Sequence, residues 1–72
     1  MNVLIFKTEL ETKIKVKTVM SIFDPHPCII DWSIDTEDID NVLRIEVFNT
    51  LKENDIITMM KTNGFYCEIL PD

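Results

Sequence analysis

The sequence predicts a small α+β domain, a ferredoxin-like βαββαβ sandwich spanning residues 1–72 as a single unit. Three observations predict it. In each half of the chain, the spacing of apolar residues changes from strand-like to helical and back. Two segments in which apolar and polar residues alternate flank a polar turn, and the one glycine follows an expected helix. Because such crossovers are right-handed, we expect a four-stranded antiparallel sheet with both helices on one face.

The first half reads as strand, helix and strand. A short apolar run over 2–7 predicts the first strand. From Lys13 onward the period becomes helical, and prolines after residue 24 end this helix because residues before proline avoid the α region. The expected buried stripe of this helix is Val16, Val19, Met20 and Phe23.

A hairpin and a second helix follow. Alternation predicts two strands joined by a polar turn over 37–41, with inward-facing residues Ile30, Trp32, Ile34, Leu43, Ile45 and Val47. Thr50 and Glu53 match a capping box, so the second helix is expected to have Thr50 as its N-cap. Gly64 stands where the helix end needs a positive φ, and 66–70 is the last strand.

Charge and cysteine content restrict the class of protein. The net charge is −6 and the pI about 4.5, which argues against nucleic acid and anionic membranes as partners. The start of the chain lacks a basic segment and makes a poor signal peptide. Two cysteines, Cys28 and Cys67, are too few for a disulfide scaffold and favour a reducing, cytoplasmic location.

A longer pattern extends from Leu10 to Glu37. Pro27 and the run from Ile29 to Asp35 belong to it, and Ile56, Met60, Gly64 and Phe65 continue it near the end of the chain. This pattern resembles the heavy-metal-associated domain family, the copper-chaperone-like fold. The resemblance implies a metal-binding loop before the first helix, with Leu10 in place of the family's methionine.

The chain departs from the family where the metal would bind. Thr12 and Lys15 stand at the two positions of the family's Cys-x-x-Cys motif. Soft ions such as Cu(I) prefer thiolate sulfur, and a lysine ammonium has no lone pair to donate. We therefore expect no metal site there and no cofactor. Lys7 departs as well, where the family's first strand is apolar, and allows a bulge or a one-residue shift there.

Lysines gather at the start of the first helix. Lys13 and Lys17 are four residues apart and should share one helix face, with Lys15 between them. Similar lysines dock partners in the family that the chain resembles. The hypothesis is that Thr12, Lys13, Lys15 and Lys17 dock an acidic protein partner. The alternative is an ordinary solvated helix face.

Three other groups could bind metal. His26 and Cys28, with Asp24 as a third ligand, could hold zinc or copper, or they could form a simple turn with a free thiol. The acidic residues Asp35, Glu37, Asp38 and Asp40 could hold Ca²⁺, although a solvated hairpin tip fits their spacing better. Met59 and Met60 could offer thioethers to copper, although methionines at helical spacing usually fill a core.

The leading interpretation is a non-enzymatic interaction domain with a metallochaperone-like fold. A divergent heavy-metal carrier using other ligands is the second, and a dimeric small-ligand regulatory sandwich is the third. An enzyme is not expected, because His26 is the only histidine and the chain has no Gly-rich phosphate loop or nucleophile elbow.

Overall fold

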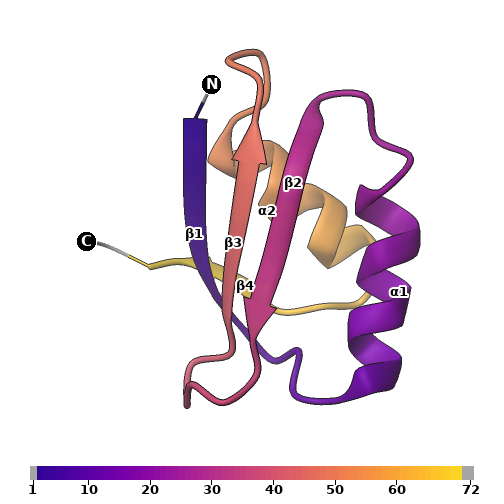
Figure 1. The fold of residues 1–72 in the computed structure, drawn as a ribbon, viewed down its shortest axis with the longest axis vertical. Coiled ribbons are helices and arrows are strands. Elements are labelled where there is room, and N and C mark those ends of the chain that lie inside the picture. The colour runs from indigo at the N-terminus through magenta and orange to yellow at the C-terminus, as the bar shows by residue number, and fades with distance from the viewer. Residues whose placement is uncertain (1, 71–72) are drawn as a thin grey trace.

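A computed structural model describes residues 2–70 of the chain. Its elements are β1 (Asn2–Thr8), α1 (Lys13–Phe23), β2 (Ile29–Asp35), β3 (Val42–Val47), α2 (Glu53–Thr62) and β4 (Cys67–Ile69). The strands form one antiparallel sheet in the order β2-β3-β1-β4, with both helices on the same side of it (Figure 1). The expected ferredoxin-like arrangement is therefore confirmed.

The core lies between the two helices and the inner face of the sheet. Phe23 of α1 meets Trp32 of β2 edge to face, with ring centroids 5.6 Å apart. Met59 packs against the core, which confirms the expected role of the methionine pair. The fully buried apolar side chains are Phe6, Leu10, Val19, Phe23, Leu43, Ile45, Val47, Ile56 and Met60.

A bulge in β2 changes which isoleucine faces the core. The pairing of β2 with β3 shifts by one residue between Ile29 and Asp31. The extra residue is Ile30, which is exposed, whereas Ile29 packs against the core. The expectation that Ile30 faces inward is therefore wrong, because simple alternation does not continue across a bulge.

Two other details differ from the sequence expectations. Met20 is exposed, because α1 turns the side that carries Val19 and Phe23 toward the sheet. The register of β1 runs without a bulge or shift through Lys7, so that expected irregularity is absent. The Lys7 ammonium instead points away from the core and lies 3.6 Å from the Asp40 carboxylate.

The second helix starts later than expected. Its N-cap is Lys52 and not Thr50, because the carboxylate of Asp55 accepts the backbone N–H of Lys52 at 2.8 Å. Leu51, which precedes the cap, is buried and fixes the entry of the chain. Of the two hydrogen bonds of a capping box, α2 has the one from the N-cap backbone N–H to the side chain three residues later, and its N-cap lies two residues beyond the predicted position. Within residues 2–70, neither helix has the length and apolar content to cross a membrane.

Candidate functional site

The connection between β1 and α1, residues 9–12, is fastened to the hairpin turn. Thr8 is buried, and its hydroxyl donates to the Asn41 carbonyl at 2.7 Å while accepting the Leu10 N–H at 3.2 Å. The backbone N–H of Thr8 also donates to the Asp40 carbonyl at 3.1 Å. The start of α1 and the turn between β2 and β3 therefore lie at the same end of the sheet (Figure 1).

Thr12 and Lys15 hold this connection together. The Thr12 hydroxyl caps α1 by accepting the Lys15 backbone N–H at 3.2 Å. The Lys15 ammonium turns back to the Glu11 carboxylate at 2.8 Å and to the Glu9 carbonyl at 3.3 Å. The hydrogen bond from Lys15 lowers the pKa of Glu11 below its ordinary value. The ammonium group of Lys15 therefore has its partners within the connection between β1 and α1.

A groove of about 550 Å³ opens between α1 and the end of β2. The apolar side chains along it are Val16 from the helix and Ile34 from the strand. Its polar lining is Thr12, Lys13, Lys17, Thr36 and Glu11, and the Glu11 carboxylate is paired with Lys15. The groove has an apolar surface beside two ammonium groups, which suits an anionic partner with an apolar side chain.

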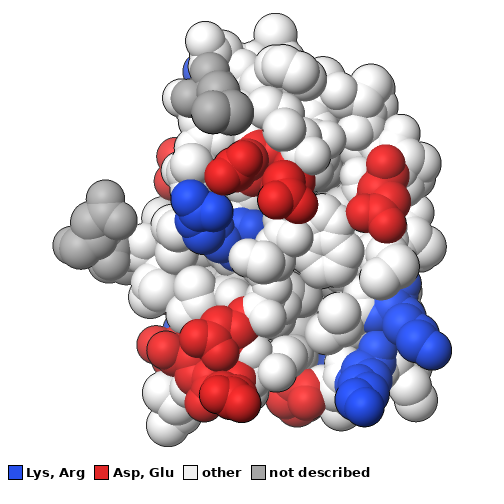
Figure 2. Space-filling model, in the orientation of Figure 1, with Lys and Arg blue, Asp and Glu red and all other residues white. Residues whose placement is uncertain are grey.

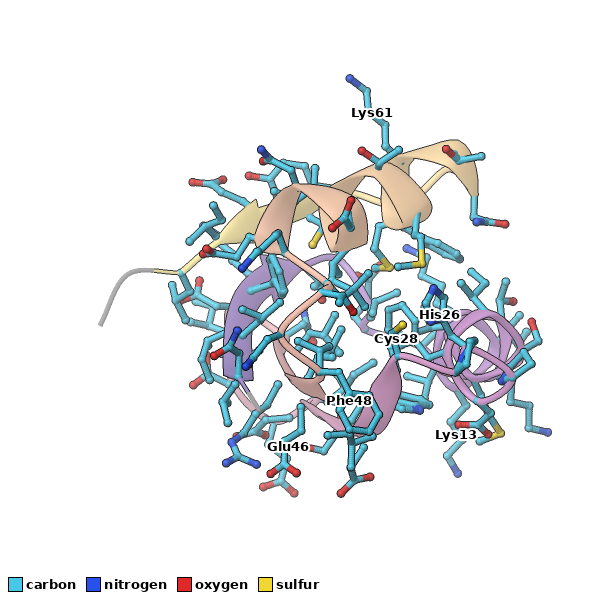
Figure 3. All side chains as sticks on the ribbon, turned by 90° about the horizontal axis from the view of Figure 1, so that it is seen from above. Lys13, His26, Cys28, Glu46, Phe48 and Lys61 are labelled. Atoms are coloured by element: carbon cyan, nitrogen blue, oxygen red, sulfur yellow. The ribbon has the colours of Figure 1, made fainter. Side chains whose placement is uncertain are left out.

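Lys13 and Lys17 differ from Lys15 in their partners. Within residues 2–70 neither forms an ion pair or a hydrogen bond through its side chain. Lys13 extends from α1 away from the body of the protein (Figure 3), and basic side chains gather on this side of the molecule at the lower right of Figure 2. Two of the four predicted docking residues therefore offer free charge, and the other two shape the loop.

The His26 and Cys28 pair lies elsewhere, between α1 and β2 (Figure 3). His26 Nδ1 accepts the backbone N–H of Cys28 at 3.1 Å, and the Asp24 carboxylate accepts the Trp32 indole N–H at 2.8 Å. Among residues 2–70 no three His, Cys, Asp or Glu side chains are grouped to hold a metal ion. The local contacts of this pair are those of a turn.

The second cysteine is remote from the first. Cys28 precedes β2 and Cys67 begins β4, and these two strands are the opposite edges of the sheet. Both thiols are free, and burial raises the pKa of Cys67 to about 11. The separation expected from the sequence is confirmed, and a shared metal or a disulfide would require the sheet to open.

The acidic hairpin uses its carboxylates to build the turn. Asp35 accepts the backbone N–H groups of Glu37 and Asp38 at 3.1 and 3.3 Å, and Asp38 accepts the N–H of Asp40 at 2.9 Å. Such contacts are typical of aspartates in turns, where the side chain replaces a backbone acceptor. The solvated hairpin tip is the interpretation that these contacts support.

The two most exposed large apolar residues among residues 2–70, Ile14 of α1 and Ile39, were not singled out from the sequence. Ile39 lies in the turn between Asp38 and Asp40, and 94% of its surface is accessible. The exposure of Ile39 could have been predicted from the sequence, because an isoleucine between two aspartates in a turn has no strand face on which to be buried.

Comparison with known proteins supports the fold. No family model and no curated protein matches the chain. The chain is similar in structure to a yeast copper transporter domain, CCC2A, solved in solution in its apo and Cu(I)-loaded states. The TM-score is 0.82 at 18% sequence identity, covering 100% of this chain and 99% of the yeast domain. The chain therefore has a fold like that of the heavy-metal-associated domains.

Proposed function

We propose that this chain is a non-enzymatic interaction domain that docks an acidic protein through the groove at the start of α1. The observation that carries the proposal is the pair Lys13 and Lys17, two ammonium groups beside an apolar groove with no carboxylate partner within residues 2–70. Complementary charge at such a surface accelerates encounter and excludes other basic surfaces. The free thiols fit a cytoplasmic domain.

The same loop argues for docking without a metal ion. The chain's two cysteines are 39 positions apart (67 − 28), so it contains no Cys-x-x-Cys motif. Lys15 places its ammonium on Glu11 in this loop, and a bound soft cation beside it would be repelled. We propose that Thr12 and Lys15 keep the loop in shape while Lys13 and Lys17 meet the partner.

Affinity capture with three baits tests the docking proposal. The baits are the natural chain, Lys13→Glu/Lys17→Glu, and the control Lys52→Glu/Lys61→Glu, which makes the same charge change at the two ends of α2. Lys61 points away from the protein on the side opposite Lys13 (Figure 3). We expect the natural chain and the control to retain the same acidic partner and the groove variant to lose it. Equal capture by all three baits would reject the proposal.

The metal part of the proposal has its own measurement. The purified chain, kept reduced, is titrated with Cu(I) in competition with a chelator, and backbone NMR signals of residues 9–17 are followed. We expect no stoichiometric binding and no shift of these signals. Tight binding of one Cu(I) with shifts confined to this loop would contradict the assignment of Thr12 and Lys15.

A further inference from the structure

The hairpin turn presents an apolar side chain between negative charges. Ile39 is the most exposed large apolar residue of the described chain, and Asp38 and Asp40 flank it. The hydrogen bonds from Asp35 and Asp38 fix the turn, and Thr8 fastens it to β1. These bonds hold the turn together and to β1, and the turn is called here the tip (residues 36–41).

The groove at the start of α1 has the opposite character. Lys13 and Lys17 supply positive charge, and Val16 and Ile34 supply the apolar contact that an isoleucine needs. Its volume of about 550 Å³ leaves room for a branched aliphatic side chain and the adjoining carboxylates. Glu11 of the groove is paired with Lys15, and Asp40 of the tip lies beside Lys7. The opposite charges left for a contact are Lys13 and Lys17 in the groove and Glu37 and Asp38 in the tip, so the two features are complementary in charge and in hydrophobicity.

A chain cannot place its own tip in its own groove. The strands β2 and β3 are paired up to Asp35 and Val42, and the bonds from Thr8 to the Asp40 and Asn41 carbonyls hold the end of the tip against β1, which lies on the far side of β3 from β2. Thr36, the first residue of the tip, itself lines the groove, which holds the two features side by side. Figure 2 shows acidic side chains at the lower left of this end and basic ones at the lower right.

A two-fold rotation satisfies both features at once. If a second copy is turned by 180° about an axis that passes between the two patches, its tip lies opposite the first groove and its groove opposite the first tip. Each contact then occurs twice, as in any isologous interface. We infer that the chain forms a two-fold dimer in which the Ile39 tip of each copy occupies the Lys13–Lys17 groove of the other.

This inference does not depend on the proposed function, although the dimer would cover the same lysines. Both chains carry a net charge of −6, which opposes association at long range. At 0.15 M salt the screening length is roughly 8 Å, so distant charges are weakened more than the pairs in contact. The dimer should therefore be reversible, and it would hide the docking surface as the chain becomes concentrated.

Sedimentation equilibrium measures the dimer directly. Concentrations from about 10 µM to about 1 mM cover the dissociation constants of weak dimers. The average mass of the natural chain should rise above the monomer mass of 8.4 kDa as its concentration increases. Ile39→Ser removes two apolar contacts per dimer, so we expect at least roughly a 100-fold weaker association. The change is at a fully exposed site, and circular dichroism should show an unchanged fold. A constant mass of 8.4 kDa up to 1 mM would overturn the inference.

A charge exchange identifies the surfaces. Lys13→Glu/Lys17→Glu makes the groove acidic. Glu37→Lys/Asp38→Asn/Asp40→Asn gives the tip a net positive charge, and the amide oxygen at position 38 can still accept the backbone N–H of residue 40. Each variant alone should stay monomeric, whereas an equimolar mixture should form a heterodimer, because each tip then faces a groove of opposite charge. Monomers in the mixture would overturn the inference.

Other dimers give different results. Phe48 follows β3 directly, is exposed and lies on the side of the sheet opposite α2 (Figure 3). Association that survives the tip and groove variants but is lost in Phe48→Ser would place the contact on that side and overturn the inference. Loss of a partner in Lys13→Glu/Lys17→Glu, but not in Ile39→Ser, separates the proposed docking function from self-association. The two conclusions can therefore fail independently.

Discussion

The two helices occupy equivalent places in the fold, but their ends are built by opposite rules. They have 11 and 10 residues and lie on the same face of the sheet. The first turn of α2 carries Glu53 and Asp55 and its last turn carries Lys61, as the helix dipole favours. The first turn of α1 has no acidic residue and its last turn no basic one.

The C-terminal ends differ as well. After α2, Gly64 adopts φ 83°, the Phe65 N–H donates to the Met60 carbonyl at 2.9 Å, and the Gly64 N–H donates to the Lys61 carbonyl at 3.0 Å. These two bonds form a Schellman motif, as the sequence predicted for this glycine. The first helix ends on Asp24 in the helical conformation, followed by proline.

The contrast shows that the charges at the ends of α2 favour its helix dipole and those at the start of α1 do not. Lysines at the start of α1 oppose the helix dipole at a cost of about 0.3–1 kcal/mol each within the first turn. The Thr12 cap and the Lys15–Glu11 pair offset part of this cost. Within residues 2–70 the Lys13 side chain forms no ion pair that would offset its cost.

The largest effect should come from the core, where the helices are alike. Phe23→Ala should destabilise the protein by about 3–5 kcal/mol and Met60→Ala by about 2–5 kcal/mol. A domain of this size has roughly 3–5 kcal/mol in total, so both variants should be largely unfolded. Urea unfolding followed by Trp32 fluorescence measures this, with the exposed Met20→Ala as control. A stable Phe23→Ala variant would contradict the packing described here.

A smaller effect is expected at the end of α2. Gly64→Ala should cost about 1–2 kcal/mol, because the left-handed conformation is unfavourable for a residue with a Cβ. No atom lies within 4 Å of the position that this Cβ would take, so the cost is conformational and not steric. Gly64→Asn should cost less, since asparagine tolerates this conformation. Equal losses in urea unfolding would show that the backbone is not the cause.

Opposite charge changes at the two helix starts should have opposite effects. Lys13→Glu should raise the free energy of unfolding by about 0.3–1 kcal/mol, and Glu53→Lys should lower it by a similar amount. Each residue is the first of its helix and is exposed. Thermal unfolding at low salt measures both, and high salt should reduce both. If Lys13→Glu is destabilising, the comparison of the two helices is wrong.

The sequence predicted the fold well because periodicity and helix ends are local signals. Val19, Phe23, Ile56 and Met60 were identified correctly from spacing alone. Ile30 was misplaced because a bulge depends on the partner strand. The cap of α2 was misplaced because lysine is not a usual N-cap residue, and the contact that marks this helix start is the Asp55 carboxylate accepting the Lys52 N–H.

The site was predictable only in part. The lysines could be named from their positions, but which of them remain unpaired could not. Lys15 is distinguished from Lys13 and Lys17 by the course of residues 9–12, which the long-range bonds of Thr8 fix. The groove also needs Ile34 from β2, and its approach to α1 is set by the whole fold.

The smallest expected effect concerns the Lys15–Glu11 pair itself. Lys15 lowers the pKa of Glu11 below its ordinary value of 4.5, so the folded state favours the ionised carboxylate. The stabilisation from this pair is present above the unfolded pKa and is lost as the pH falls through the lower folded pKa. In Lys15→Met, the NMR titration midpoint of Glu11 should rise toward the ordinary value, while in the control Lys13→Met, which removes a neighbouring charge, it should stay lowered. An unchanged Glu11 midpoint in Lys15→Met would mean that the ammonium does not occupy the loop, and Lys15 would then belong with Lys13 and Lys17 as a charge available to a partner.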